Sequence, residues 1–172
     1  IDGNQDLINR GEKFYAEHPD TSFYVPRFKQ ALVTKSNVNK ILSEAGFEGE
    51  IDLLSIDIDG NDYWIWEAIE RIQPRIVVIE THVEFGLRSI VVPYKEDFVW
   101  SPDHPHYLGA SPLAMTKLAK RLGYRLVGSN RFGFNAFYLR NDLGHDVIPK
   151  VDVNVLFRHA RNRERMQIFE TV

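Results

Sequence analysis

The sequence has 172 residues, of which 44% are hydrophobic, so it holds enough apolar material for one globular domain with one core. Its 21 basic and 24 acidic residues are well mixed, which favours a small-molecule partner over a nucleic acid or an anionic membrane. The absence of cysteine excludes disulfides, thiolate metal sites and cysteine nucleophiles. Without a membrane-length apolar run or a secretory signal, we expect a cytoplasmic protein.

The first third of the chain carries a strand pattern followed by a helix pattern. Residues 28–34 alternate in polarity and are rich in strand formers, which predicts a β-strand. Asn37 is typical of a helix N-cap, and the apolar spacing after it predicts an amphipathic helix through Ala45 that Gly46 ends. Residues 51–58 are then almost continuously apolar. This pattern is typical of a central strand that helices cover on both faces.

A second helix and a second buried strand follow. After a polar turn at residues 59–62, apolar side chains recur at helical spacing over residues 63–72, and Pro74 prevents the helix from continuing. Residues 75–81 repeat the buried-strand pattern. Strands that alternate with helices predict a parallel sheet with right-handed crossovers.

The second half of the chain begins with a long loop. Residues 82–110 contain three prolines and two glycines, and this segment is too long for an ordinary connection, which favours a functional loop or lid. A helix is predicted over residues 111–122, with a proline at its first position. Residues 124–129 and 134–140 predict a hairpin, and hence an antiparallel strand added to the sheet. Residues 151–172 are polar and arginine-rich, which predicts a peripheral helix or a flexible tail with a solvated face.

Polar side chains gather at the carboxyl end of the strand over residues 51–58, where ligands bind in open α/β sheets. Asn61 and Asp62 are explained by the turn and by capping of the next helix. Asp57 differs from them, because a carboxylate on a strand covered on both faces is costly to desolvate unless it has a partner or a ligand. We therefore expect Asp57 to be functional.

Two other motifs compete for the same polar run. A calcium-binding loop that began at Asp57 would need Gly and Glu where Asp62 and Ala68 stand, so this type of site is excluded. The run Asp-Ile-Asp-Gly also resembles the nucleophile motif of haloacid-dehalogenase-like phosphatases, in which the first aspartate attacks a phosphoryl group. That match is short, and Asn61 stands where this family usually has Thr or Val.

A longer set of motifs occurs in order along residues 1–143. The motifs are IDLLSIDIDGNDYWIW, PRIVVIE, VPY, FVW, GAS, GYRLVG and NAF. The set resembles the FkbM-type methyltransferases. The resemblance implies a class I, Rossmann-like α/β domain of three layers, whose mostly parallel sheet ends in an antiparallel hairpin strand. It also implies methyl transfer from S-adenosylmethionine to the hydroxyl of a sugar or another small molecule. Residues 144–172 would then form a polar C-terminal extension.

The resemblance assigns roles to individual residues. Asp2 corresponds to the acidic residue at the end of the second strand, whose carboxylate accepts hydrogen bonds from the ribose hydroxyls of the cofactor. The alternative for Asp2 is a surface aspartate in a turn. Thr34 and Asn37 lie in the loop that faces adenine, although Asn37 is equally explained as a helix cap. Asp57 lies close to the reacting methyl group.

Glu80 and His82 end the following strand, so we expect them to converge with Asp57 above the sheet. Some relatives hold acceptor hydroxyls with a divalent metal such as magnesium, and two carboxylates with an imidazole are plausible ligands for one. His82 could instead take the acceptor's proton as a general base, or it could simply begin a loop and hydrogen-bond the backbone. The sequence leaves these alternatives open.

The glycine-rich loop that holds the methionine end of the cofactor in this class is missing from the sequence. Because residues 1–3 resemble the end of the second strand, we expect the first strand, its helix and most of the second strand to lie upstream. We therefore expect this chain alone to bind S-adenosylmethionine poorly. A non-catalytic binding or assembly module is the runner-up, and the phosphatase ranks third.

Overall fold

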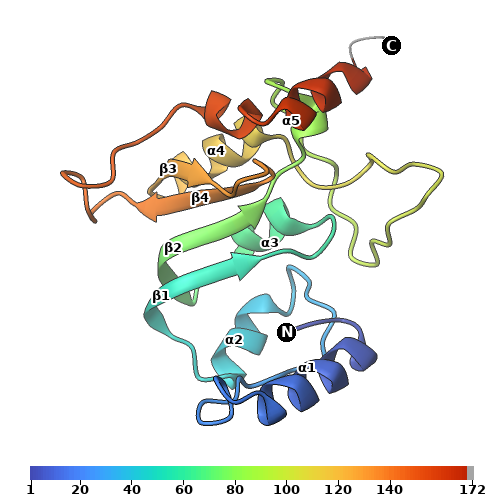
Figure 1. Ribbon diagram of the computed structural model, residues 1–172, viewed down its shortest axis with the longest axis vertical. Coiled ribbons are helices and arrows are strands. Elements are labelled where there is room, and N and C mark those ends of the chain that lie inside the picture. The colour runs from blue at the N-terminus through green and yellow to red at the C-terminus, as the bar shows by residue number, and fades with distance from the viewer. Residues whose placement is uncertain (170–172) are drawn as a thin grey trace.

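The computed structural model describes residues 1–169, which fold as an α/β protein around a four-stranded open mixed sheet (Figure 1). The sheet order is β1-β2-β4-β3. Its strands are β1 (Gly49–Ile56), β2 (Ile72–Glu80), β3 (Tyr124–Ser129) and β4 (Asn135–Arg140). Strands β1 and β2 are parallel, whereas β4 runs antiparallel to both β2 and β3. The predicted α/β class, parallel strand pair and antiparallel hairpin are therefore confirmed.

Short helices surround this sheet. They are α1 (Gln5–Glu17), α2 (Val38–Glu44), α3 (Asp62–Ala68), α4 (Pro112–Arg121) and α5 (Ala160–Arg165), with 3₁₀ turns at Val83–Phe85, Val153–Phe157 and Met166–Phe169. The predicted starts of α2 after Asn37 and of α4 after Ser111 are confirmed. Across residues 1–169, none of these helices combines the length and the apolar character that a membrane crossing requires.

The main core lies between one face of the sheet and the helices α3 and α4. Val77 and Ile79 of β2 point into it and are fully buried. Trp66 of α3 and Met115 of α4 pack against them, and the Trp66 ring lies 5.2 Å from that of Tyr138. A smaller cluster joins α2 to α3. This packing fixes the ends of β1 and β2 relative to the helices, and those ends carry the candidate site.

The prediction of a central β1 buried on both faces is wrong. Strand β1 lies at one edge of the sheet, where β2 is its partner, and the Leu53 side chain is 56% exposed. Residues 28–34 do not form the predicted strand. They contribute one isolated parallel bridge, between Gln30 and Asp2. Within the described residues, the outer edge of β1 therefore has no strand beside it. Leu53 and its β2 partner Ile76 are both exposed, at 56% and 39%, so the sheet face that they share is not fully covered.

The predicted helix over residues 63–72 is also too long. Helix α3 ends at Ala68, and Ile72 already belongs to β2, as does Pro74. The cause is Asn39 of α2, whose amide donates to the Ala68 carbonyl at 2.7 Å and accepts from the Glu70 amide at 2.9 Å. This side chain satisfies the helix end from outside, so the chain can turn before Pro74.

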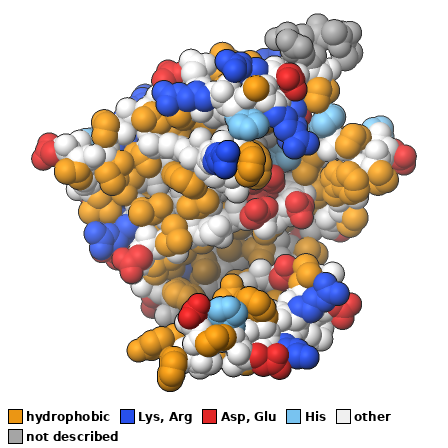
Figure 2. Space-filling view, in the orientation of Figure 1, with side chains coloured by type: hydrophobic (Ala, Val, Ile, Leu, Met, Phe, Trp, Pro, Cys, Tyr) orange, Lys and Arg blue, Asp and Glu red, His pale blue; other side chains and the backbone are white. Residues whose placement is uncertain are grey.

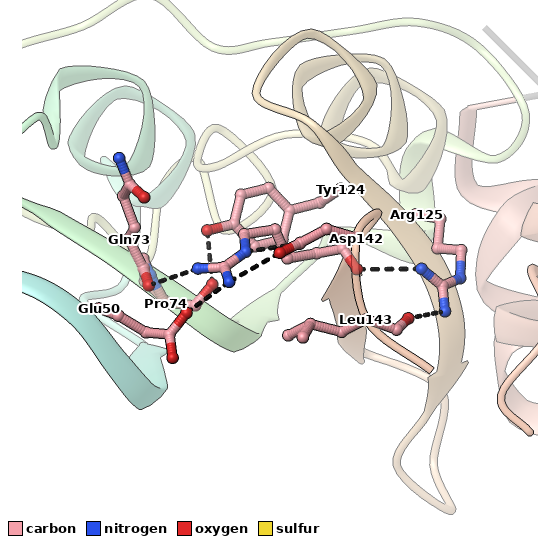
Figure 3. Close-up of polar contacts among 8 residues, drawn as sticks. Glu50, Gln73, Pro74, Tyr124, Arg125, Asp142 and Leu143 are labelled. Carbon is pink, nitrogen blue, oxygen red and sulfur yellow. Dashed lines mark hydrogen bonds and ion pairs between the residues drawn. The ribbon is translucent and has the colours of Figure 1, made fainter. Parts of the chain in front are cut away.

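An arginine network closes the end of the sheet far from the candidate site (Figure 3). Arg140 of β4 pairs with Asp142 and with Glu50 of β1, and it donates to the Gln73 carbonyl of β2 at 3.2 Å. The buried Arg125 donates to the Leu143 carbonyl at 2.6 Å. These contacts join strands that are distant in the sequence, so we assign them to stability.

The C-terminal arginine-rich segment is a helical segment that packs on the sheet, rather than a tail. Leu156 is fully buried in the main core, and Val151 donates its amide to the Leu126 carbonyl of β3 at 2.9 Å. Its arginines are Arg158, Arg161, Arg163 and Arg165. Residues 170–172 of the predicted tail lie outside the described residues, and the domain boundary at residue 143 remains a prediction.

Candidate functional site

The turn between β1 and α3 has an unusual backbone that one buried carboxylate holds in place. Asp62, only 1% exposed, accepts hydrogen bonds from the amides of Ile58 and Gly60, both at 3.0 Å. Gly60 has a φ of 150°, and a Cβ there would lie 2.3 Å from the Phe98 ring. A side chain at this position would therefore clash with Phe98 as well as strain the backbone.

Asn61 and Asp62 stabilise the turn, as predicted. The predicted side-chain cap of α3 by Asn61 is absent. Asn61 occupies the N-cap position of α3 without a side-chain cap bond, and its amide instead donates to the Lys95 carbonyl at 2.8 Å. Asp62 holds the turn as described above. The bond from Asn61 to Lys95 ties the turn to the long loop over residues 82–110. This loop is irregular apart from a 3₁₀ turn at Val83–Phe85 and a bridge between Val91 and Ala110.

Three carboxylates converge at the carboxyl ends of β1 and β2. One oxygen each of Asp57, Asp59 and Glu80 lies within 4.8 Å of the others. Asp57 and Glu80 were expected to meet here, whereas Asp59 was not singled out. The alternating acidic residues of the Asp-Ile-Asp run were the available signal for it. Asp57 follows β1 and is exposed, so the expectation that it lies on a strand covered on both faces is wrong.

Two of these carboxylates, Glu80 and Asp57, have raised pKa values. Burial raises the pKa of Glu80 to about 8, and the charges of Asp57, Asp62, Asp59 and Glu84 add to the shift. Partial desolvation, followed by repulsion from Asp59, raises the pKa of Asp57, although this residue is exposed as a whole. The group is therefore short of positive charge and would be stabilised by a proton or a cation.

His82 stands beside this acidic group. Its Nε2 atom lies 3.7 Å from a Glu80 oxygen, and its Nδ1 atom lies 3.9 Å from Glu84, which pairs with Arg165 at 3.0 Å. The ring is 13% exposed and lies against Gly109, where a Cβ would approach it to 2.2 Å. Burial lowers the pKa of His82, and the charge of Glu84 opposes that shift.

One alternative for His82 is that it begins a loop and hydrogen-bonds the backbone. Within the described part of the chain, its Nε2 atom makes no such hydrogen bond. Nε2 is buried, with no hydrogen-bond partner among residues 1–169. The backbone amide of His82 does donate, to the Ala110 carbonyl at 2.8 Å. A buried imidazole nitrogen that faces a carboxylate is chemically available, either to accept a proton or to bind a cation.

A cavity of about 210 Å³ opens next to the acidic group. It is lined by residues 1–3, 31–33 and 57–59 with Asn61, Glu96 and Phe98. The lining contains four acidic side chains and no Lys or Arg. In the space-filling view, a hollow separates the N-terminal part from the sheet, and acidic side chains lie above it (Figure 2). Its charge suits a cationic ligand.

The two aspartates expected to contact the cofactor, Asp2 and Asp57, both line this cavity. The Oδ1 atom of Asp2 also accepts the Asn4 amide at 2.7 Å, as an aspartate in a turn would. Thr34 and Asn37 are not among the lining residues. Asn37 accepts the Thr34 amide at 2.8 Å and donates to the Leu32 carbonyl at 2.9 Å, so it shapes the loop whose residues 31–33 do line the cavity.

Some contributors to the site were not predicted. Helix α1, which follows Asp2, was missed, although Asn4 caps it through its side chain and Ile8 is its buried residue. That capping residue and the apolar spacing after it were a usable signal. Glu96 and Phe98 reach the cavity from the long loop, and no local pattern reveals the path of an irregular loop.

No family model matches the chain, and neither the curated proteins nor the solved structures provide a match. The sequence motifs and the geometry described above therefore carry the functional argument.

Proposed function

We propose that this chain forms the greater part of an S-adenosylmethionine-dependent methyltransferase domain of the FkbM type, with a Rossmann-like fold. The main observation in support of this proposal is that Asp2 and Asp57, which are far apart in the sequence, line one cavity at the carboxyl end of β1. These are the residues to which the family resemblance gives ribose-binding and methyl-proximal roles. S-adenosylmethionine is cationic at its sulfonium and its amine, and the cavity lining is acidic.

The arrangement of the strands supports the same proposal. An antiparallel strand, β4, lies between the parallel strand β2 and the other hairpin strand, β3. The resemblance implies an antiparallel hairpin strand after the parallel strands, and β4 provides one. Asp2 and Gln30 form a single isolated parallel bridge outside the sheet, and the N-terminus lies on the side of the open β1 edge (Figure 1). In the proposal, a glycine-rich strand and loop outside these 172 residues would pair along that edge.

The reaction would transfer a methyl group from the sulfonium of the cofactor to an acceptor hydroxyl oxygen, with loss of the hydroxyl proton and release of S-adenosylhomocysteine. His82 is suited to take that proton, because its lowered pKa keeps it neutral near pH 7 and its Nε2 atom is unpartnered among the described residues. Asp57 would help to orient the reacting groups. Positioning would supply most of the rate.

A divalent metal such as magnesium fits the acidic group. Asp57, Asp59 and Glu80 offer hard oxygen ligands close together. Burial first, and then the neighbouring carboxylates, raise the pKa of Glu80, and a bound cation would offset that negative charge. His82 lies at its side rather than within the carboxylate triad. When bound, the metal would hold and polarise the acceptor hydroxyl.

Substitutions in a form that contains the proposed glycine-rich segment test these roles. Asp2→Asn and Asp57→Asn should each weaken S-adenosylhomocysteine binding by about tenfold or more in calorimetry, because each removes a charged hydrogen-bond acceptor. Asp52→Asn is the matched control, since Asp52 lies on β1 with its side chain 93% exposed and outside the cavity lining. Equal affinity in all three variants would refute the assigned roles.

A magnesium-dependent phosphatase is the second candidate, because the convergence of Asp57, Asp59 and Glu80 would suit it as well. Magnesium-dependent release of phosphate from 4-nitrophenyl phosphate, abolished by Asp57→Asn, would favour this activity over methyl transfer. If the protein neither releases phosphate nor binds the cofactor, a non-catalytic binding module is the function that remains.

A further inference from the structure

A second cavity, of about 270 Å³, lies between the β3–β4 turn and the C-terminal helical segment. Its lining residues are Phe132, Phe134, His159, Arg161, Asn162 and Arg165. The cavity therefore uses two of the arginines that the sequence pattern alone assigns to a solvated face. The acidic side chains of the first cavity have no counterpart in this lining.

The wall of this cavity is held rigidly. Asn162, only 2% exposed, donates to the carbonyls of Phe132 at 2.6 Å and Leu156 at 2.8 Å. Gly133 has a φ of 82°, and a Cβ there would lie 2.2 Å from the Leu156 carbonyl oxygen. The glycine thus permits a close approach of the turn to the C-terminal segment, and Asn162 joins the two.

The groups that face the cavity are aromatic and basic. The rings of Phe132 and Phe134 are nearly parallel, at 8° with centroids 6.1 Å apart, yet Phe132 remains 49% exposed. Arg161 forms no ion pair with any acidic side chain in the described part of the chain. The Nδ1 atom of His159 is buried and has no hydrogen-bond partner there. Arg165 forms an ion pair with Glu84, with 3.0 Å between a guanidinium nitrogen and a carboxylate oxygen.

The cavity adjoins the candidate site. Thr81, which lies between Glu80 and His82, donates both its amide and its hydroxyl to the Phe134 carbonyl, at 2.7 and 3.2 Å. Arg165 lines the cavity and pairs with Glu84, the neighbour of His82. The ion pair between Arg165 and Glu84 and the contact of Glu84 with His82 thus connect the cavity to the candidate site.

We propose that this cavity binds the anionic group, a phosphate or a carboxylate, of a small molecule whose ring packs on Phe132. Arg161 and Arg165, which both line the cavity, supply the positive charge that binds the anionic group. The exposed Phe132 ring supplies an apolar surface for the rest of the molecule. The assignment of this molecule as the methyl acceptor rests on the proposed function, whereas binding of an anion does not.

The test is a calorimetric titration of phenyl phosphate into the chain at low ionic strength without divalent metal. Phenol, which lacks the charge, and inorganic phosphate, which lacks the ring, should each bind more weakly than phenyl phosphate. Arg161→Gln should weaken phenyl phosphate binding about tenfold, as expected for loss of one hydrogen bond to a charged group. Phe132→Leu should weaken phenyl phosphate binding but not phosphate binding.

Arg163→Gln is the matched control, because Arg163 is exposed on the same helix and does not line the cavity. Its affinity for phenyl phosphate should remain that of the unsubstituted chain. No saturable binding, or equal weakening by both arginine substitutions, would overturn the proposal. Phenyl phosphate binding in a protein that fails to bind S-adenosylhomocysteine would preserve the anion site and remove its assignment to a methyl acceptor.

Discussion

Glu80 is the residue whose environment most clearly departs from that of an ordinary surface carboxylate. Its carboxyl group lies beside Asp57 and Asp59, and Asp62 and Glu84 add further negative charge. An acid whose pKa is raised in the folded state binds its proton more tightly there than in the unfolded chain. Folding is therefore favoured below the unfolded pKa of 4.5, and this contribution is lost as the pH rises toward about 8.

Glu80→Gln should consequently stabilise the protein in a pH-dependent way. In the presence of a chelator, the Tm of the variant should exceed that of the unsubstituted chain by more at pH 8 than at pH 5, with each kcal/mol worth about 2–4 °C. Glu70→Gln, on the exposed residue after α3, is the control and should show a constant difference. A Glu80→Gln difference that did not change with pH would contradict the electrostatic account.

The same variant tests the metal proposal. Magnesium added at pH 8 should raise the Tm of the unsubstituted chain, because a cation that binds only the folded protein stabilises it. The increase should be much smaller for Glu80→Gln, which removes one charged ligand. An equal increase in both proteins would place the bound magnesium elsewhere.

At the level of the elements, some structure follows from local sequence and some does not. The pairing of β3 with β4 follows from two strand patterns around a turn, and helix α4 follows from Ser111 and Pro112 at its start. The edge position of β1 could not be predicted. An apolar run shows that a strand is suited to burial, but it does not show whether another strand lies beside it. The end of α3 depends on Asn39, which lies in another helix.

The contact between the β3–β4 turn and the C-terminal segment predicts a large difference between two glycines. Gly133→Ala should destabilise the protein by more than about 2 kcal/mol, because it combines backbone strain with a clash against the Leu156 carbonyl. Gly46 has the same φ of 82° with nothing within 4 Å of an added Cβ, so Gly46→Ala should cost only about 1 kcal/mol. Denaturant unfolding measures both. Equal losses would show that the close contact does not form.

For the whole molecule, the linings of the two cavities carry opposite charge. The acidic cavity carries Asp2, Asp57, Asp59 and Glu96, and the basic one carries Arg161 and Arg165. Glu80 and His82 lie close to both. The proximity of Asp57 and Glu80 could be predicted from the sequence, because both lie at the carboxyl ends of neighbouring parallel strands, whereas His82 lies beside Glu80 and outside the carboxylate triad. The basic cavity could not be predicted, because it forms only when a hairpin turn meets a helix far along the chain.

The most direct test of the central claim is calorimetric titration of S-adenosylhomocysteine into this chain and into a form extended upstream of Ile1 through the proposed strand and glycine-rich loop. The account predicts saturable binding by the extended form and weak or no binding by the chain alone. An absence of binding by both forms would contradict the methyltransferase proposal and favour a non-catalytic module.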